Sequence, residues 1–323
     1  MNRFAHGGDI YSRHIEHDFS ANINPLGLPD EVLLEISDSL WRCGNYPDPS
    51  CRELIRAISD SEWFPSGRIV CGNGAADMIY RIVSAFKPRR ALVCAPTFSE
   101  YEKALTEHGC AIRQHFLSQE NDFRVTCNIL SDITSDIDIL FLCNPNNPTG
   151  QLIDREVLEQ VADYCQKTDT CLLLDECFHD FLEEGSVHTL LPRVKENPKL
   201  FVLRAFTKMY GMAGLRLGYG ICSDTELIRR MEQVTQPWNV SVPAQAAGIA
   251  AAREQEFVAV SRQMITEQKK LLLAGLEAAG AKVYGSAANY IFFRAAPGFD
   301  TRMYRAGFMV RNCGNYDGLT EGF

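Results

Sequence analysis

Between residues 139 and 150 the chain reads Ile139-Leu140-Phe141-Leu142-Cys143-Asn144-Pro145-Asn146-Asn147-Pro148-Thr149-Gly150. The five apolar residues predict a strand that is buried on both faces. The prolines stiffen the turn that follows, because each ring fixes its own φ. Asn147 is then presented at the end of the strand. A proline-rich turn without a function is the alternative, and the density of Asn and Pro favours a binding site.

The chain on either side of this stretch repeats the same plan. Residues 91–94, 171–174 and 200–203 are near-continuously apolar, and polar or turn-forming residues follow each run. Helical patterns lie between these runs, as in residues 154–167, where Asp154 is a candidate N-cap. Alternating strands and helices predict an α/β fold with a mostly parallel sheet flanked by helices.

The pattern changes from about residue 225. A long helical stretch covers residues 254–279, and residues 289–293 follow as a strand. These elements predict a smaller α+β domain beside the large one. We expect residues 1–40 to form an N-terminal arm and part of the small domain, residues 41–224 the large domain, and residues 225–323 the C-terminal small domain.

Composition and charge exclude several classes of protein. The 323 residues are 46% hydrophobic and 23% charged, and the net charge is −9. This acidic balance disfavours a nucleic-acid interface, which needs a basic face. No apolar run is long enough for a membrane span, so we expect a cytoplasmic protein. The twelve cysteines form no C-x-x-C pair, and we expect no metal site.

Ligands of open α/β sheets bind where the strands end, and charged residues lie there. Lys208 comes shortly after the strand at 200–203, and Arg216 follows eight residues later. A Lys whose pKa is lowered by burial can form a Schiff base with a carbonyl, and an Arg fork binds phosphate. A surface Lys and a structural Arg are the alternative.

Two further strand ends carry polar groups. Asp175 ends the strand at 171–174, where a carboxylate can hold a buried cation or simply cap a helix. Residues 72–77 read Gly-Asn-Gly-Ala-Ala-Asp and open a helix, whose backbone N–H groups suit a phosphate. The G-x-G-x-x-G fingerprint of dinucleotide-binding proteins fails there, because its last position is Asp77. Phe98, after Ala95-Pro96-Thr97, is a candidate to stack on a flat ring.

Taken in order, these segments resemble a fold-type-I pyridoxal 5′-phosphate (PLP) enzyme. They are similar to the branch that holds histidinol-phosphate aminotransferases and the threonine-phosphate decarboxylases of cobalamin biosynthesis. The resemblance implies that Lys208 forms the Schiff base with PLP and that Asp175 pairs with the pyridinium nitrogen. It further implies cofactor contacts from Asn147, Phe98, Gly74, Ala75, Ala76, Thr207 and Arg216.

The resemblance also implies a homodimer with shared active sites. Tyr46, in Asn45-Tyr46-Pro47-Asp48, is similar to the Tyr that reaches the phosphate of the neighbouring subunit. Relatives continue past the position of Phe323 into a strand with a carboxylate-binding Arg. We therefore expect an incomplete small domain, which leaves a catalytically weak PLP-binding protein as one alternative.

Finer features favour the decarboxylases. Residues 5–8, 18–27 and 311–316 look more like the decarboxylases than the aminotransferases, and Phe178 stands where aminotransferases typically carry Tyr. The sequence thus predicts decarboxylation of L-threonine O-3-phosphate to aminopropanol phosphate, with a histidinol-phosphate-type aminotransferase as the alternative. Arg311, His6 and Asn24 are the predicted substrate-binding residues, and a surface Arg on an edge strand is the alternative for Arg311.

Overall fold

The computed structural model describes residues 6–12 and 15–323. Its largest sheet is built from β2 (Ile69–Gly72), β3 (Arg90–Ala95), β4 (Ala111–Phe116), β5 (Ile139–Cys143), β6 (Cys171–Asp175), β7 (Leu200–Ala205) and β8 (Gly218–Cys222). The strands lie in the order β2-β8-β7-β6-β5-β3-β4. Strands β3 to β7 pair in parallel, and β8 runs antiparallel to both β7 and β2. The predicted mostly parallel sheet is confirmed.

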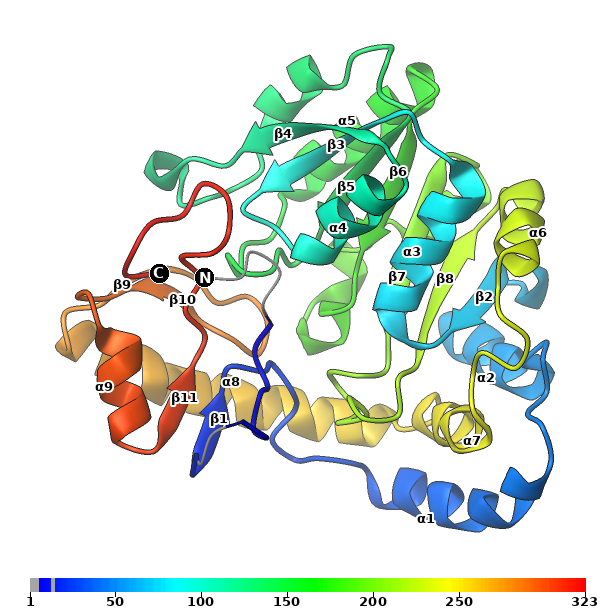
Figure 1. Cartoon of the computed structure of the whole chain (residues 1–323), viewed down its shortest axis with the longest axis horizontal. Helices are drawn as coiled ribbons and strands as arrows, with labels where there is room; N and C mark the ends of the chain where they lie inside the picture. The colour runs from blue at the N-terminus through cyan, green and yellow to red at the C-terminus, as the bar shows by residue number, and fades with distance from the viewer. Residues whose placement is uncertain (1–5, 13–14) are drawn as a thin grey trace.

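Helices cover both faces of this sheet (Figure 1). They are α2 (Arg52–Glu62), α3 (Gly74–Phe86), α4 (Ser99–Glu107), α5 (Arg155–Lys167), α6 (Thr225–Gln233) and α7 (Val242–Ala251), while α1 (Asp30–Ser39) packs on α7. Successive side chains of a strand point to opposite faces, so each strand serves two cores. In β6, Leu172 and Leu174 belong to the core shared with α2, α5 and α7, whereas Leu173 belongs to the core shared with α3, α4 and α6.

Local sequence explains where several helices begin. The Asp224 side chain accepts hydrogen bonds from the N–H groups of Glu226 and Leu227 at the start of α6, and Ser241 caps α7 in the same way. Asp154 is the N-cap residue of α5 as predicted, but its side chain makes no capping hydrogen bond. Short 3-10 helices complete the chain: Leu40–Gly44, Ser66–Arg68, Gln119–Asn121, Cys127–Asp132, His179–Phe181, Gly185–Val187 and Leu191–Lys195.

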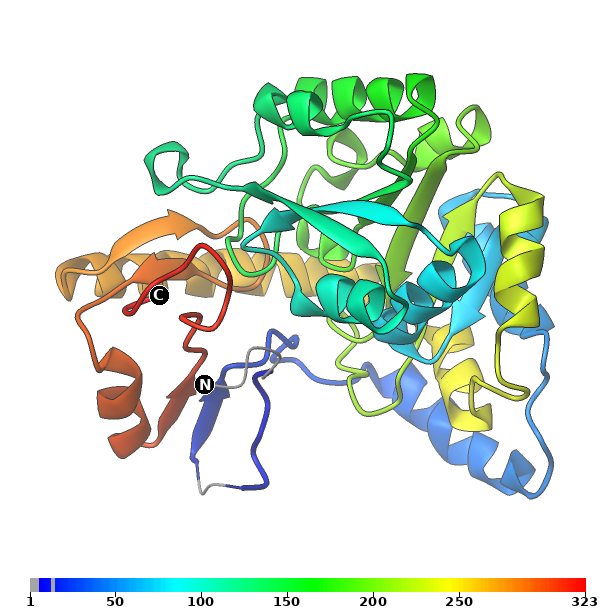
Figure 2. The same ribbon diagram turned by 45° about the horizontal axis from the view of Figure 1, so that its top comes forward.

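A smaller unit lies beside the sheet domain. It contains the long helix α8 (Gln255–Ala278), the antiparallel pair β9 (Lys282–Gly285) and β10 (Phe292–Arg294), α9 (Phe299–Arg305) and β11 (Phe308–Val310). Strand β1 (His17–Phe19) pairs in parallel with β11, as Figures 1 and 2 show, so the N-terminal arm joins this unit. The strand predicted at 289–293 begins later, at Phe292.

The packing of helices α6 and α7 indicates where the boundary between the two domains lies, which the sequence predicts at residue 224. Helix α6 packs on α3, and α7 packs on α1 and α2. Both helices therefore bury their apolar residues against the large domain. We propose that the small domain begins near residue 252, just before α8.

Candidate active site

The register of the sheet brings the predicted site residues to one edge. Cys143 at the end of β5 pairs with Asp175 at the end of β6. Because β8 is antiparallel, its first residue, Gly218, pairs with Ala205 at the end of β7 and with Gly72 at the end of β2. The loops that carry Asn147, Asp175, Lys208, Arg216 and Gly74 all leave the sheet at this edge.

Lys208 lies in the loop after β7, and its amine is placed beside an aromatic ring. Its Nζ atom is 5.8 Å from the centre of the Phe178 ring. Burial lowers the pKa of the Lys208 amine, and the positive charge of Arg216 lowers it further, against opposing effects of Cys177 and Asp175. A lowered pKa increases the neutral fraction of the amine, which is the form that attacks a carbonyl.

Asp175 is buried, with only 4% of its surface exposed. The Tyr101 hydroxyl donates a hydrogen bond to its Oδ2 at 2.6 Å, and the Cys177 N–H donates to Oδ1 at 2.9 Å. Burial is the main cause that raises the pKa of this carboxyl. Within residues 6–12 and 15–323, no Lys or Arg forms an ion pair with it. A cation placed against Asp175, such as a protonated ring nitrogen, would restore its charged form.

A cradle for an anion forms where α3 begins. Gly74 has a φ of +85°, and a Cβ atom there would lie 2.6 Å from Nη2 of Arg216. Ala75 and Ala76 follow in the first turn of α3, and a Cβ on Gly218 would lie 2.7 Å from the Ala75 nitrogen. The glycines thus let a guanidinium approach the N–H groups of a helix start, and both groups favour phosphate. Thr207, the residue before Lys208, is buried, and its predicted phosphate contact stays a prediction.

The turn that carries Asn147 is held in place by its neighbour. Asn146 accepts a hydrogen bond from the Thr97 hydroxyl at 2.8 Å, and its amide donates to the carbonyl of Pro96 at 3.1 Å. The Tyr290 hydroxyl donates to the Asn146 carbonyl at 2.7 Å. Asn147 itself is half-buried on this fixed turn. The turn is therefore rigid where the sequence predicts a contact to the cofactor.

Phe98 immediately precedes α4 and lies beside a candidate substrate residue. Its ring meets the Tyr101 ring edge-on at 5.6 Å, and the His6 ring lies 5.8 Å away. The His6 ring nitrogen Nε2 is 2.7 Å from Oε1 of Glu100, a residue in the first turn of α4. Glu100 thus anchors the predicted substrate-binding His6 next to the predicted ring-stacking Phe98.

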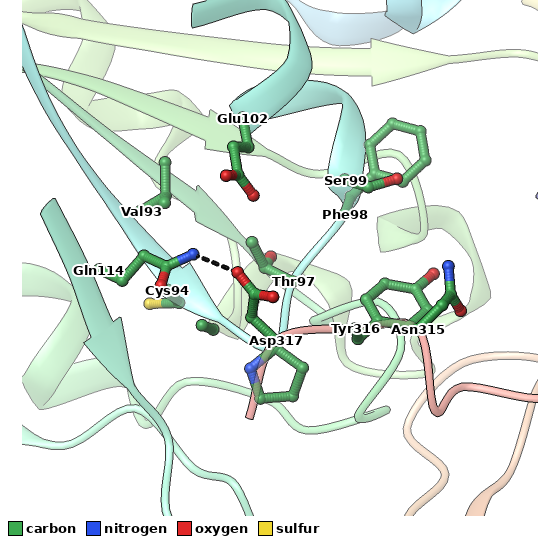
Figure 3. Close-up of a pocket in the computed structure, with 12 residues that line it drawn as sticks. Val93, Cys94, Thr97, Phe98, Ser99, Glu102, Gln114, Asn315, Tyr316 and Asp317 are labelled. Carbon is green, nitrogen blue, oxygen red and sulfur yellow. Dashed lines mark hydrogen bonds between the residues drawn. The ribbon is translucent and has the colours of Figure 1, made fainter. Parts of the chain in front are cut away.

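Arg311 follows β11 and reaches the same region. Its Nη2 donates to Oδ1 of Asn315 at 3.0 Å, and its guanidinium lies 5.6 Å from the centre of the Tyr316 ring. Asn315 and Tyr316 line a pocket with Phe98, and Figure 3 shows them facing it from the segment after β11. Arg311 is thus placed close to the predicted cofactor region.

Asn24 has surroundings that differ from its predicted role. Its side-chain amide donates to the carbonyl of Met209 and to the hydroxyl of Ser261, both at 2.7 Å, and only 2% of the residue is exposed. Both amide hydrogens are therefore used within the protein. These contacts do not support the predicted substrate-binding role, because they leave Asn24 no donor for a substrate anion.

Tyr46 lies on the surface, in the segment between α1 and α2. It is 74% exposed, and its ring stacks on Trp238 at 4.0 Å. Its predicted contact with the phosphate of a neighbouring subunit stays a prediction.

Two residues that contact the predicted site have no recognisable signal in the sequence. Tyr101 binds Asp175 from a helix 74 residues earlier, and Tyr290 binds the Asn146 carbonyl from the small domain, 144 residues later. Tyr101 stands where an amphipathic helix needs a core residue, so its pattern gives no signal of a site. Tyr290 stands in a mostly apolar run, so its pattern likewise indicates a strand or core residue and not a site.

Comparison with known proteins supplies the family. The model of aminotransferase class I and II matches residues 15–306. The chain belongs to this aminotransferase class I and II family. Family membership confirms PLP as the cofactor and confirms the fold predicted from the sequence.

Individual relatives of this aminotransferase family member carry two different activities in their names. A threonine-phosphate decarboxylase of Salmonella typhimurium is 36% identical, covering 98% of this chain and 89% of that protein. A histidinol-phosphate aminotransferase of Methanococcoides burtonii is 32% identical, covering 92% of this chain and 81% of that protein. Among solved structures, the histidinol-phosphate aminotransferase of Clostridium acetobutylicum gives a TM-score of 0.89 at 28% identity, covering 95% and 92% of the two chains. The predicted branch of the family is therefore confirmed.

One negative finding accompanies these comparisons. In the described part of this aminotransferase-family chain, no helix is both long and apolar enough to cross a bilayer.

Proposed function

We propose that the protein is a PLP-dependent decarboxylase that converts L-threonine O-3-phosphate to aminopropanol phosphate. The observation that carries this proposal is the Phe178 ring beside the Lys208 amine, 5.8 Å away. By resemblance, the aminotransferases of this branch place a Tyr hydroxyl at this position and the decarboxylases a Phe. The similarity to the Salmonella typhimurium threonine-phosphate decarboxylase supports the same choice.

The chemistry of the residues at the sheet edge suits PLP, because it combines a Lys amine, a buried carboxylate and an anion cradle. Lys208 would bind its aldehyde, Asp175 its ring nitrogen and Asn147 its 3-hydroxyl, while Phe98 would lie against the ring. Arg216, with the first turn of α3, would hold the phosphate, because the cradle at Gly74 joins a guanidinium to a helix start.

The chemistry is divided between the cofactor and the chain. Bound PLP supplies an electron sink for the pair of electrons that is released when the bond from Cα to the carboxylate breaks. Asp175 keeps the ring nitrogen protonated, since a buried carboxylate and a cation stabilise each other. Lys208 acts as the acid that returns a proton to Cα, because burial lowers the pKa of its amine and so weakens its hold on the proton.

Substrate recognition falls to the groups beside the pocket of Figure 3. Arg311 offers a planar fork to the phosphate of the substrate, and its contacts with Asn315 and Tyr316 fix the direction of that fork. His6, held by Glu100, adds a second donor near Phe98. By fixing the phosphate, these residues would hold the substrate so that its carboxylate, and not its Cα hydrogen, is the group that leaves.

A histidinol-phosphate-type aminotransferase is the second candidate. The specific observation in its favour is the structural match to the Clostridium acetobutylicum enzyme, with a TM-score of 0.89. In that reaction the Cα–H bond would stand perpendicular to the ring, and Lys208 would move its proton.

One experiment separates the candidates. Purified protein with PLP is incubated with threonine phosphate, and in parallel with histidinol phosphate plus 2-oxoglutarate. We expect CO₂ and aminopropanol phosphate in the first reaction and no glutamate in the second. Glutamate in the second reaction without CO₂ in the first would overturn the decarboxylase proposal in favour of the aminotransferase.

Two controls complete this test. Lys208→Ala is the control for product that forms without the proposed acid, and we expect neither CO₂ nor glutamate above background from it. Bound PLP with neither product from the unmodified protein would contradict both enzymes and favour a catalytically weak PLP-binding protein.

We also propose a homodimer with shared sites. Tyr46, Trp41 and Trp63 are strongly exposed, and aromatic residues are enriched where protein surfaces meet. Sedimentation velocity should give a dimer at micromolar concentration. Tyr46→Phe should weaken PLP binding and leave the dimer intact. A monomer with full PLP affinity would contradict this proposal.

A further inference from the structure

Asn24 lies at a junction of three segments. Its backbone N–H donates to the carbonyl of Lys208 at 3.0 Å. Its side-chain amide donates to the carbonyl of Met209 and to the Ser261 hydroxyl, both at 2.7 Å. Asn24 belongs to the N-terminal arm, Lys208 and Met209 to the loop after β7, and Ser261 to α8. One buried side chain thus connects the arm, the Lys208 loop and the long helix.

The surrounding packing makes this junction rigid. The Asn24 side-chain oxygen accepts from the Leu26 N–H at 3.1 Å, which fixes the orientation of the amide. Gly211 has a φ of +62°, and a Cβ atom there would lie 2.5 Å from the carbonyl of Gly27. The arm and the Lys208 loop are therefore in direct backbone contact. Ser261 is fully buried, so its hydroxyl cannot exchange its protein partner for a hydrogen bond to water.

We propose that Asn24 is a positioning residue that fixes the main chain of Lys208 relative to α8. The direction of the Lys208 amine then depends on where α8, and with it the small domain, stands. This inference rests on the proposed function of Lys208 as the cofactor-binding amine. It gives Asn24 a role in aligning that amine instead of the predicted contact with substrate.

The chemistry of the amide explains why this position carries Asn. Its two N–H groups serve two acceptors at once, the Met209 carbonyl and the Ser261 oxygen. An Asp here has no N–H to donate, so a charged oxygen would face the Met209 carbonyl. Asn24→Asp therefore keeps the shape of the side chain but removes its hydrogen bond to the Met209 carbonyl, while the backbone N–H of residue 24 still donates to the Lys208 carbonyl. Ser261→Ala removes only the link to α8.

Hydrogen exchange of the cofactor-free protein tests the junction without any activity. In Asn24→Asp we expect amides of residues 206–213 to exchange about tenfold faster, the factor that corresponds to one lost buried hydrogen bond. Ser261→Ala should speed exchange in α8 with a smaller effect on 206–213. Asn197→Ala is the matched control, because Asn197 is equally buried and lies just before β7, at the opposite end of that strand from Lys208.

Two measurements on the PLP-loaded protein test the effect on Lys208. We expect Asn24→Asp to shift the pH midpoint of the visible absorption of bound PLP and to lower kcat for threonine phosphate about tenfold, with KM little changed. Asn197→Ala should lower the melting temperature and leave both quantities unchanged.

The outcomes are distinct. A raised KM with unchanged exchange, midpoint and kcat would overturn the proposal in favour of a substrate contact. A lower melting temperature as the only effect would overturn it in favour of a purely structural residue. If Asn24→Asp does not fold, Ser261→Ala with normal exchange, midpoint and kcat overturns it. Failure of the proposed function appears separately, as no borohydride-fixed PLP on Lys208 of the unmodified protein.

Discussion

Replacing Asp175 by Asn separates two effects of the carboxyl group. One is its effect on the stability of the cofactor-free protein, and the other is its contribution to the affinity for PLP. The Asn side chain has the same shape and can keep both present contacts, by accepting from the Cys177 N–H and donating to the Tyr101 oxygen. The fold should therefore survive. The change removes only the negative charge, from a residue that is 4% exposed.

The expected size of the effect follows from the bond that is lost. A hydrogen bond to a charged group contributes about 1.5–3 kcal/mol. PLP affinity should fall about tenfold to a hundredfold in Asp175→Asn. Turnover with saturating PLP should fall as well, because a neutral partner no longer holds the proton on the ring nitrogen.

The stability of the cofactor-free protein should change in the opposite direction. Burial raises the pKa of Asp175 above its value in the unfolded chain. Stability therefore falls as pH rises from the unfolded pKa, about 3.9, and the loss is complete once pH exceeds the folded pKa. Asn carries no such penalty, so cofactor-free Asp175→Asn should melt at a higher temperature than the unmodified protein at pH 7.5.

Two measurements check this reasoning. PLP titration followed by visible absorption gives the affinity, and scanning calorimetry without PLP gives the melting temperatures at pH 5 and pH 7.5. Tyr101→Phe is the control, since it removes a neutral donor and should weaken PLP binding by less than Asp175→Asn does. Unchanged PLP affinity and turnover in Asp175→Asn would refute the role of this carboxylate.

Three further changes have defined outcomes. Lys208→Ala should abolish the PLP that borohydride fixes to the protein, and fixation on another Lys in the digest would refute the assignment. Arg311→Ala should raise KM for threonine phosphate about tenfold to a hundredfold, the loss of one charge-assisted contact, with little change in PLP affinity. Arg204 lies at 2.9 Å from carboxylate oxygens of Glu176 and Glu62. Arg204→Met should cost about 3–5 kcal/mol in urea unfolding, because it leaves buried carboxylates without their cation. An unchanged urea midpoint would contradict that cost.

The sequence predicts the part of this molecule that depends on short-range pattern. Continuous apolar runs bounded by polar turns identify the parallel strands, because every side chain of a strand that is buried on both faces packs in a core. Asp175 stands out for the same reason, as a charged residue directly after such a run, and Lys208 stands out as a charged residue a few positions after the next run. Their common edge follows from the parallel arrangement alone.

The rest depends on contacts between distant segments, which no local pattern records. The stretch from residue 225 that forms α6 and α7 reads as the start of a second domain, yet α7 packs on α1, about two hundred residues earlier. Asn24 sits in a turn-rich motif that suits a ligand contact, and only the folded chain shows Met209 and Ser261 beside it. Tyr101 likewise has the pattern of a core residue, and its hydroxyl reaches Asp175 only in three dimensions.

The division of β6 between two cores has a consequence for insertions and deletions. Leu172 and Leu174 face one core, and Leu173 faces the other on the same side as Asp175. Shifting the strand by one residue would exchange the leucines, and each core would still receive an apolar side chain. Asp175, however, would turn to the opposite face, away from Tyr101. A single-residue deletion that shifts this end of β6 should therefore cost stability as well as the site, because it places a carboxylate without a partner in an apolar core. Among the side chains of β6, the Asp175 carboxylate is thus the one that distinguishes the observed alignment from its neighbour.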